Sequence, residues 1–544
     1  MGKISDKTMQ KSRRLPTFIF LISIVALIAG ALIHYRFGYF SYDQSGHAWG
    51  VDDAYISYRY AQNLSLGHGL VFNPGERVEG YSNLLFVILA SLLLSSGVGI
   101  SQLYFAITLI NLAVAVLMLI IFYKFLQSQF GNEKASIGAL LLGISPLMWV
   151  WVAAGMEVPL VLLFQLFIWI ATVRLEKQDS HIYTGVWIVA TLLLCLTRAD
   201  GFVLPVISLL FLALKRKYRL FILLLAVLLI VMGTYTFWRY SYYGQFLPNT
   251  YYAKVSGPIV QRVVFALALL AYIAVNQGFL GYLAAILQSS YSQIRENLSK
   301  HRPLFADTRF DAFASIGWLG YWLYIGGGTY LERFLMILIP FSIFALLSLI
   351  KKAPTREGWI MIAIFVLLPS TTLFIDRRFD YSTDKYDRRI KLGTYLNINH
   401  HGETLAVDAA GKISLYSGLF AMDMLGLNDP YIAHIIPQFI SPGHNKFDPD
   451  YIFNRQPDLI SAWIAACPED DCNWLDLSYG LSEEKYQRQG YTLIYLIYTG
   501  KTPPGEWIVD VSKYDRQAKL ELIDLGYIYG VLKRIDNTGF SLSR

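Results

Sequence analysis

Long apolar runs, separated by short polar segments, dominate the first 375 residues of this 544-residue chain. An apolar run of roughly 17–25 residues is long enough to cross a bilayer as an α-helix. The pattern therefore predicts about eleven transmembrane helices. They are expected near residues 16–34, 103–123, 136–154, 158–173, 184–197, 202–214, 220–238, 262–287, 312–326, 334–350 and 358–375.

The apolar run 83–100 is short, and we expect it to lie along the membrane interface rather than to cross. With this assignment, the Lys and Arg residues of the connecting loops collect on the side of the N-terminus. Basic loops mark the cytoplasmic side of a membrane protein. The first apolar run shows no small-residue cleavage site, so we predict a retained signal-anchor helix.

The loops on the opposite side carry most of the motif-like sequence. They are the segments around Asp52 and Asp53, 155–159, 197–201, 242–254 and 326–334. One topology thus separates the basic loops from the motif-like loops, and it predicts that the motif-like loops converge on one outer face.

The pattern changes near Asp376 to that of a soluble domain of ordinary size. Short β-like runs at 404–407, 491–498, 507–511 and 527–532 alternate with helical and turn-rich stretches. The predicted fold is a polytopic α-helical membrane protein with a C-terminal α/β domain outside the cytoplasm. The expected boundaries are a membrane domain over 1–375, with a first outer loop at 35–102, and the α/β domain over 376–544.

Composition agrees with a membrane protein, since 55% of residues are hydrophobic and only 16% are charged. The net charge of +7 would also suit a nucleic-acid partner, but the basic residues sit in short loops between apolar runs. We therefore expect no nucleic acid. Cys467 and Cys472 lie in the polar C-terminal part. Two cysteines offer too few ligands for a metal site, so we expect them to form a local disulfide in an oxidising compartment.

The first outer loop, Val51–Asn83, holds the strongest candidate chemistry. Asp52 and Asp53 are adjacent carboxylates at the start of an expected helix, and one of them could act as a general base. On that helix Tyr55, Tyr58, Arg59 and Gln62 share a face. The simpler interpretation is that the Asp pair caps the helix.

The segments Asp-Asp-Ala-Tyr-Ile-Ser-Tyr-Arg-Tyr and Gly-His-Gly-Leu-Val-Phe-Asn-Pro-Gly-Glu-Arg-Val-Glu-Gly-Tyr-Ser-Asn resemble bacterial membrane glycosyltransferases of the GT-C class. The resemblance is nearest to the mycobacterial-type terminal β-(1→2)-arabinofuranosyltransferases and their uncharacterised relatives. It extends to Thr-Arg-Ala-Asp-Gly (197–201), where relatives have Pro for Ala199, and to the C-terminal segments 407–411, 416–418, 423–429 and 442–444. Relatives often carry an Asp after the paired glycines near 326–329, and its absence here puts the identity of the sugar in doubt.

The resemblance implies that the protein transfers a sugar from a polyprenyl-phosphate donor to a cell-envelope glycan, with inversion at the anomeric carbon. A pentofuranose such as arabinofuranose is the preferred sugar. Asp52 and Asp53 would be catalytic, with Asp52 marginally preferred as the base. Outer-side cations would bind the donor phosphate, although each alone could also be a snorkelling boundary residue. These cations are Arg59, Arg198, Lys254 and Arg333.

Further polar residues of the outer loops are candidates for holding the sugar or the acceptor. They are Tyr55, His68, Glu79, Glu157, Asp200, Asn249 and Tyr251. For Glu157 a structural role at the helix start before Pro159 carries more weight. No cluster has metal-ligand spacing, so a divalent metal could be held only by the carboxylates. We expect the α/β domain to bind the acceptor.

Two other classes compete with a glycosyltransferase of the bacterial cytoplasmic membrane. A transporter or lipid-linked sugar flippase usually has ionisable residues or broken helices near the membrane midplane, and the predicted spans have no ionisable residue away from their ends. A non-enzymatic envelope-assembly subunit would tolerate substitution of the carboxylates. The sequence leaves the oligomeric state open.

Overall fold

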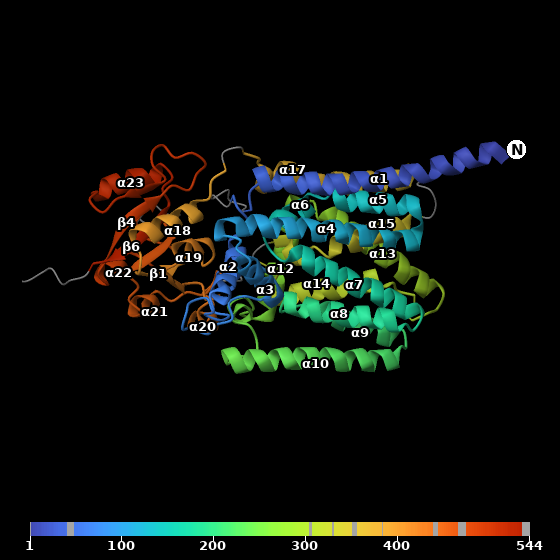
Figure 1. Cartoon of the computed structure of the whole chain (residues 1–544), viewed down its shortest axis with the longest axis horizontal. Helices are drawn as coiled ribbons and strands as arrows, with labels where there is room; N and C mark the ends of the chain where they lie inside the picture. The colour runs from blue at the N-terminus through green and yellow to red at the C-terminus, as the bar shows by residue number, and fades with distance from the viewer. Residues whose placement is uncertain are drawn as a thin grey trace, which may run out of the picture.

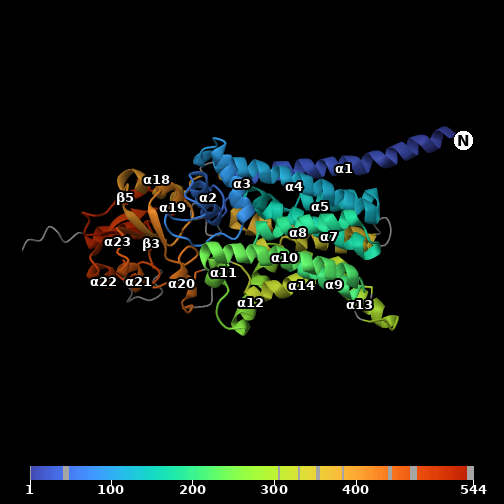
Figure 2. The ribbon, with the colours of Figure 1, turned by 60° about the horizontal axis from the view of Figure 1, so that its bottom comes forward.

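The molecule is elongated, with a bundle of helices at one end and a sheet-containing part at the other (Figure 1). The N-terminus lies at the far end of the bundle, and α2 and α3 lie where the two parts meet (Figures 1 and 2). The computed structural model describes residues 2–40, 48–303, 307–328, 331–350, 356–382, 385–438, 444–465 and 475–535.

Among the described residues, five helices are long and apolar enough to cross a membrane. They are α1 (Gly2–Phe37), α4 (Ile100–Phe130), α7 (Val158–Lys177), α10 (Tyr218–Tyr243) and α12 (Ile259–Asn276). The apolar helices α5 (Asn132–Gly143) and α6 (Pro146–Ala153) form a pair bent by 56°, the geometry of a broken span or a re-entrant loop. The bend falls where Pro146 begins the second helix, since a proline cannot donate the hydrogen bond that would continue the first.

The other helices of this part are shorter or less apolar. They are α2 (Asp52–Ser65), α3 (Leu84–Ser95), α8 (His181–Thr197), α9 (Val203–Leu214), α11 (Asn249–Lys254), α13 (Leu280–Ser299), α14 (Phe310–Ile325), the 3-10 helix η1 (Leu331–Leu335), α15 (Leu338–Leu349), α16 (Arg356–Ser370) and α17 (Thr372–Ile375). Most of the predicted apolar runs coincide with helices, but 136–154 is divided between α5 and α6, and 262–287 is divided as well. The count of about eleven crossings stays a prediction.

The run 262–287 is not the single helix that the sequence predicts. It is divided between α12 and α13, with a break at residues 277–279. At the break Gly278 has φ +61°, and a Cβ there would lie 2.2 Å from the carbonyl oxygen of Leu368 in α16. The chain therefore turns where its backbone packs directly on a neighbouring helix, a tertiary contact that hydropathy cannot reveal.

The C-terminal part is built on a six-stranded mixed sheet in the order β2-β1-β3-β6-β4-β5. Strand β1 is parallel to β2 and β3, whereas β6 is antiparallel to β3 and β4. The strands are β1 (Thr404–Val407), β2 (Phe420–Asp423), β3 (Leu459–Trp463), β4 (Tyr491–Ile497), β5 (Ile508–Asp510) and β6 (Tyr529–Arg534). The helices are η2 (Arg377–Phe379), α18 (Arg388–Asn399), α19 (Lys412–Ser417), α20 (Pro430–His434), α21 (Pro449–Asn454), α22 (Glu483–Arg488) and α23 (Arg516–Asp524).

This sheet confirms the predicted α/β domain, and a strand occupies each of the four predicted β-like runs. The sequence interpretation missed β2 and β3. Both pair in parallel with β1 and are buried along most of their length, and such strands lack the alternation of polar and apolar residues that marks a half-exposed strand.

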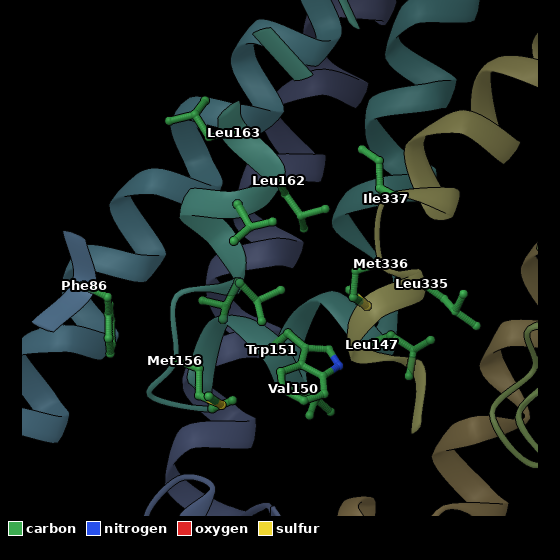
Figure 3. Packing of buried hydrophobic residues seen from close by; sticks show 14 of the residues in the cluster. Phe86, Leu147, Val150, Trp151, Met156, Leu162, Leu163, Leu335, Met336 and Ile337 are labelled. Atoms are coloured by element: carbon green, nitrogen blue, oxygen red, sulfur yellow. The ribbon is translucent and has the colours of Figure 1, made fainter. Parts of the chain in front are cut away.

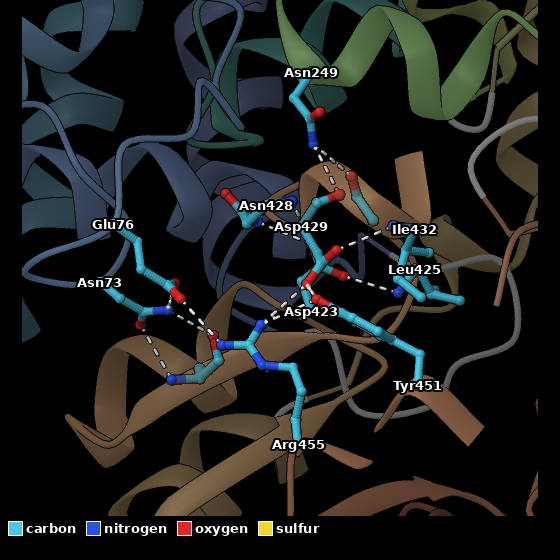
Figure 4. Close-up of polar contacts among 12 residues, drawn as sticks. Asn73, Glu76, Asn249, Asp423, Leu425, Asn428, Asp429, Ile432, Tyr451 and Arg455 are labelled. Atoms are coloured by element: carbon cyan, nitrogen blue, oxygen red, sulfur yellow. Dashed lines mark hydrogen bonds and ion pairs between the residues drawn. The ribbon is translucent and has the colours of Figure 1, made fainter. Parts of the chain in front are cut away.

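Polar contacts join the first outer loop to the domain (Figure 4). Arg455 forms ion pairs with Glu76 at 3.1 Å and with Asp429 at 3.2 Å. Asn73 donates from its amide to the carbonyl oxygen of Ala421 at 2.9 Å. The loop that carries the candidate carboxylates is therefore fixed between the helical bundle and the domain.

Candidate active site

Asp52 and Asp53 are the first two residues of α2, where the helix dipole favours negative charge. Successive residues of an α-helix are rotated by about 100°, so the two side chains face different surroundings. Neither residue caps the helix, because the N-cap is Val51 and no side-chain cap bond forms. The capping interpretation of the pair is therefore wrong.

Asp52 is buried against the C-terminal domain. Its Oδ2 accepts the backbone N–H of Gly411 at 3.0 Å, and its Oδ1 accepts that of Lys412 at 3.0 Å. The guanidinium of Arg389 lies 3.4 Å from Oδ1. A Cβ on Gly411 would lie 2.0 Å from the carbonyl oxygen of Asp52, so this contact requires glycine. The carboxylate of Asp52 thus joins the domain to the first loop.

Asp53 faces away from these contacts and stays accessible. Its side chain is 21% exposed, and the ammonium of Lys254 lies 3.6 Å from Oδ2. No described residue donates a hydrogen bond to it. A bound hydroxyl meets no competing donor from these residues at Asp53, whereas the Asp52 carboxylate is buried and already holds two backbone N–H groups. Of the two carboxylates, Asp53 is therefore the one open to a bound group, whereas the sequence interpretation marginally preferred Asp52.

A cavity of about 320 Å³ opens beside Lys254 at this end of the bundle. Arg198 and Arg333 also line it, together with Asp200 and Tyr251. The walls come from the loop before α9, the segment around α11, the end of α14 and the segment that follows it. The other lining residues are Ser82, Ala199, Phe202, Leu247, Pro248, Thr250, Val255, Tyr321, Tyr324, Ile325, Gly327, Gly328 and Phe334.

Buried ion pairs fix the two arginines of the cavity. Arg198 pairs with Asp200 at 2.6 Å and with Glu157 at 3.2 Å. Arg333 pairs with the same oxygen of Glu157. Burial alone would raise the pKa of Glu157, but the positive charges of Arg333 and Arg198 lower it. Glu157 also accepts a hydrogen bond from the amide of Asn83 at 2.8 Å, and it stands as a fixed anion behind the cavity wall.

The segment that carries Arg333 is held from two sides. Glu332 accepts a hydrogen bond from the indole of Trp151 at 2.8 Å and pairs with Arg378 at 2.9 Å. Residues 335–337 pack beside Trp151 in the apolar core (Figure 3). These contacts set the position of the Arg333 guanidinium.

Arg59, the fourth predicted phosphate ligand, does not line the cavity. Its guanidinium donates to the carbonyl oxygens of Phe72 at 2.8 Å and Leu419 at 2.7 Å, to that of Ser414, and to Asn73 Oδ1 at 2.8 Å. Burial lowers its pKa to about 10. In this structure Arg59 ties α2 to the domain.

Tyr55 and His68 also lie away from the cavity. The buried phenol of Tyr55 donates to the carbonyl oxygen of Trp49 at 2.7 Å. His68 is exposed, and its Nδ1 lies 3.4 Å from Asn63 Oδ1. The polar contacts that both residues make are with neighbouring parts of the protein and not with the cavity.

Glu79 and Asn249 serve as links between elements near the cavity. Glu79 is buried and pairs with Arg239 of α10 at 2.5 Å. Burial raises the pKa of Glu79 to about 7, although Arg239 opposes this. The amide of Asn249 donates to the carbonyl oxygens of Gly426 at 2.8 Å and Asp429 at 3.2 Å; Asn249 and Asp429 are drawn in Figure 4. Of the predicted sugar or acceptor contacts, Asp200 and Tyr251 line the cavity, and Glu157 lies behind its wall.

Sequence reasoning missed several residues of the site. Tyr321 and Tyr324 line the cavity, and the Tyr321 hydroxyl lies 3.4 Å from Asp200 Oδ2. Both tyrosines end an apolar run, where aromatic residues are common at any membrane interface. Arg389 is more than 300 residues from its partner Asp52, and no sequence signal connects the two.

Among the residues that the structure describes, no three His, Cys, Asp or Glu side chains gather as ligands for a metal ion. The cation beside Asp53 is the ammonium of Lys254. Cys467 and Cys472, the predicted disulfide pair, lie outside the described residues. Cys195 is buried and free.

Comparison of the sequence with known families matches residues 378–518 to a domain of unknown function, DUF8728. This match covers most of the sheet-containing part and none of the helical bundle. No curated protein matches the chain.

Solved structures resemble the chain over more of its length. ArnT from Cupriavidus metallidurans, bound to undecaprenyl phosphate, is 12% identical, with 94% of this chain and 98% of that chain covered and a TM-score of 0.55. Two structures of the Archaeoglobus fulgidus oligosaccharyltransferase also match. One, with Zn and sulfate, is 14% identical, with 73% of this chain covered and a TM-score of 0.45. The other, AglB with an inhibitory peptide and a dolichol-phosphate, is 13% identical, with 81% and 69% of the two chains covered and a TM-score of 0.48.

The present chain spans 62% of the length of the first oligosaccharyltransferase structure. At these identities the likeness establishes the fold, and it rests on ArnT, which matches over nearly the whole of both chains. The predicted GT-C-like membrane fold with a C-terminal α/β domain is confirmed. The arabinofuranosyltransferase subfamily stays a prediction.

Proposed function

We propose that the chain is a membrane glycosyltransferase that takes its sugar from a polyprenyl-phosphate donor. The observation that carries this proposal is an accessible carboxylate, Asp53, beside a cavity lined by Lys254, Arg198 and Arg333. The fold supports it, because the ArnT structure with the same architecture contains undecaprenyl phosphate.

The charges around the cavity suit a phosphodiester that becomes a phosphate monoester. The site holds three cations and three carboxylates, so its formal charge is zero before a donor binds. They are Lys254, Arg198, Arg333, Asp53, Asp200 and Glu157. A donor phosphodiester carries one negative charge, and the leaving phosphate carries one more. Lys254 and Arg333 are placed to stabilise that added charge.

The reaction proceeds in one displacement. The acceptor hydroxyl oxygen attacks the anomeric carbon while the bond from that carbon to the phosphate oxygen breaks, and its electron pair leaves with the phosphate. Asp53 takes the hydroxyl proton. The carboxylate thus becomes neutral as the phosphate gains its charge, which keeps the total charge of the site constant. A positioned base contributes about 10²–10⁴-fold to such a step.

The finer assignment follows the sequence. A pentofuranose such as arabinofuranose is the proposed sugar, transferred with inversion to a cell-envelope glycan. Tyr251, Tyr321 and Tyr324 offer rings and hydroxyls to the sugar from the cavity wall. In the topology predicted from the sequence, the basic loops lie on the same side of the membrane as the N-terminus, which is the cytoplasmic side. The motif-like loops then lie on the opposite side, which supports a reaction at the outer side of the bacterial cytoplasmic membrane. The α/β domain would then bind the acceptor.

The test is transfer from synthetic polyprenyl-phosphate sugars, arabinofuranose first, to envelope oligosaccharides by purified protein in detergent. Product from one donor, lost in Asp53→Asn, is the expected result. Solute uptake into proteoliposomes without any acceptor, together with full function of Asp53→Asn, would instead favour the transporter class.

A further inference from the structure

The helix α12 is apolar, yet much of its surface does not pack against the rest of the protein. It carries one charged side chain, Arg262. Along the opposite face, four apolar side chains are between 50% and 69% exposed. They are Val260, Val264, Leu267 and Val275. A contiguous apolar face of this kind marks an interaction surface, and the position of the helix in the bundle identifies the partner.

The first half of α12 lies at the domain end of the bundle, against the end of α14 that borders the cavity. Arg262 donates from Nη1 to the carbonyl oxygen of Tyr324 at 2.7 Å. Two turns further on, Leu269 packs on the bend after α14, since a Cβ on Gly327 would lie 2.8 Å from its Cδ2. Tyr324 and Gly327 both line the cavity. A helix that ran beside α14 would place Leu269 about 10 Å further along the bundle, so α12 takes another direction.

The second half of α12 lies at the same end of the bundle, level with the end of α1. Tyr272 and Asn276 border a cavity of about 270 Å³ that is also lined by residues 375–377. The next residue, Arg378, accepts with its carbonyl oxygen the N–H of Tyr39 at 2.9 Å. Tyr39 follows the last residue of α1 by two positions. Because α1 starts at the far end of the bundle, this contact marks the domain end (Figure 1).

Both ends of α12 therefore lie at one end of the bundle. Its 18 residues span about 27 Å, close to the roughly 30 Å of the hydrocarbon core of a bilayer. A crossing helix of this length would place its ends near opposite surfaces. The helix α10 runs along the length of the bundle, whereas α12 stays near the domain end in both views (Figures 1 and 2). The helix α12 thus lies across the bundle, although it is long enough to cross a membrane.

The positions of the basic residues lead to the same result. In the topology predicted from the sequence, the segment 242–254 lies outside and the Lys and Arg residues of 295–309 lie inside. An odd number of crossings must therefore separate these segments. The helix α13 packs along α15 and α16 and supplies one crossing. A second crossing by α12 would place the four Lys and Arg residues of 295–309 on the outer side.

We infer that α12 lies in the plane of the membrane, within the outer leaflet, and that lipid acyl chains are the partner of its exposed face. An α-helix can lie in lipid without a protein partner, because its backbone hydrogen bonds are satisfied within the helix. The exposed face has no charged side chain, which suits acyl chains better than water. The inference does not rest on the proposed function.

This position gives the cavity a lipid-facing neighbour. Val255, a residue of the cavity wall, precedes the first residue of α12 by four positions. Tyr324, on another wall, is the residue that Arg262 holds. With α12 in the outer leaflet, these walls lie at the depth of the outer-leaflet lipids.

The test compares α12 with α10 by spin labelling of the full chain in lipid nanodiscs. Single cysteines carry a nitroxide at three exposed positions of each helix, with the same spacing of seven and eight residues. The three α10 side chains are 63–74% exposed and serve as the matched control. Accessibility to oxygen and to a water-soluble nickel chelate gives the depth of each label, and the unsubstituted protein gives the background from native cysteines. The variants are Val260→Cys, Leu267→Cys and Val275→Cys on α12, and Ile222→Cys, Leu229→Cys and Phe237→Cys on α10.

On α10 we expect the label at Leu229 about 10 Å deeper than the other two, since seven residues of a crossing helix span that distance. On α12 we expect all three labels in the lipid at a common depth, with differences below about half of this value. A label at Leu267 that is as deep relative to its neighbours as the label at Leu229 would overturn the inference. So would α12 labels that contact water instead of lipid, or that a protein neighbour shields from both reagents.

A cryo-EM structure of the unsubstituted protein in nanodiscs decides the question if a cysteine variant does not fold. Transmembrane helices tilt by about 0–40° from the bilayer normal. We expect α10 within this range and α12 outside it. An α12 axis within this range, with one end near the inner surface, would contradict the inference.

Discussion

The first turn of α2 carries two carboxylates of the same chemistry in different surroundings. One faces the C-terminal domain, and the other faces the cavity. On the domain side, Asp52 accepts two backbone N–H groups and pairs with Arg389. On the cavity side, Asp53 is 21% exposed, and within the described part of the chain its ion pair is with Lys254. One carboxylate is committed to holding the molecule together, and the other is free for a substrate.

This difference teaches that two adjacent acids need not share one role. A buried carboxylate with all its partners supplied by the protein stabilises a junction, and its loss costs free energy of folding. An accessible carboxylate beside a cavity contributes little to stability and can exchange a proton. Asp52 and Asp53 should therefore separate in experiments that measure stability and turnover independently.

The largest expected effect is on turnover in Asp53→Asn. Removal of the base should lower transfer by about 10²–10⁴-fold, because the amide cannot take the acceptor proton. The melting temperature should stay close to that of the wild type, since Asp53 is partly exposed and its polar contact with the described residues is the 3.6 Å pair with Lys254. Transfer kinetics and a thermal melt of the same sample check both statements. Wild-type turnover in this variant would remove Asp53 from the reaction.

The variant Lys254→Gln tests whether the cavity side of α2 binds the donor phosphate. Loss of the ammonium should weaken binding of undecaprenyl phosphate by about tenfold, the value of one charge-assisted hydrogen bond. Lys217→Gln is a matched control, because Lys217 also pairs with an Asp, at 3.0 Å, away from the cavity. Equal donor affinity in both variants would place the lipid phosphate elsewhere.

On the domain side, Asp52→Ala and Gly411→Ala should each lower the free energy of unfolding by roughly 1–3 kcal/mol. The first leaves two backbone N–H groups without their partner, and the second forces a methyl group against the Asp52 backbone. Thermal or denaturant unfolding in detergent measures the loss. A fully stable Gly411→Ala protein would show that the junction does not depend on this contact.

The smallest expected effect is a pH dependence from Glu79. Burial raises its pKa to about 7, above the ordinary value of 4.5, so its ionised form is disfavoured in the folded protein. Its contribution to stability should therefore fall as pH rises from 4.5 towards 7. The melting temperature of the wild type, compared with Glu79→Gln at about pH 5.5 and about pH 8, isolates this slope. An identical pH profile in both proteins would contradict it.

Much of the helical part could be predicted, because apolar runs long enough to cross a bilayer have few alternatives. The break at Gly278 could not, since it depends on the backbone of Leu368, 90 residues away in the chain. In the domain, β1 lies where the sequence predicts it, whereas β2 and β3 are mostly buried neighbours of β1 without a polar alternation.

For the site, the sequence pointed to the first-loop motif and the outer-side cations, and the structure places Asp53, Lys254, Arg198 and Arg333 at one end of the helical bundle. The motif could not tell Asp52 from Asp53, because the difference comes from Gly411 and Lys412, which fold back from another domain. Arg59 was equally ambiguous, since a cation next to a catalytic motif can serve the substrate or the fold.

The central claim is that a polyprenyl-phosphate donor binds in the cavity beside Asp53. A cryo-EM structure of the full chain with undecaprenyl phosphate tests it most directly. We expect the phosphate about 3 Å from the Lys254 ammonium or the Arg333 guanidinium, on the side of the cavity that Asp53 faces. A phosphate bound outside this cavity, with Lys254 and Arg333 still in their present ion pairs, would contradict the claim.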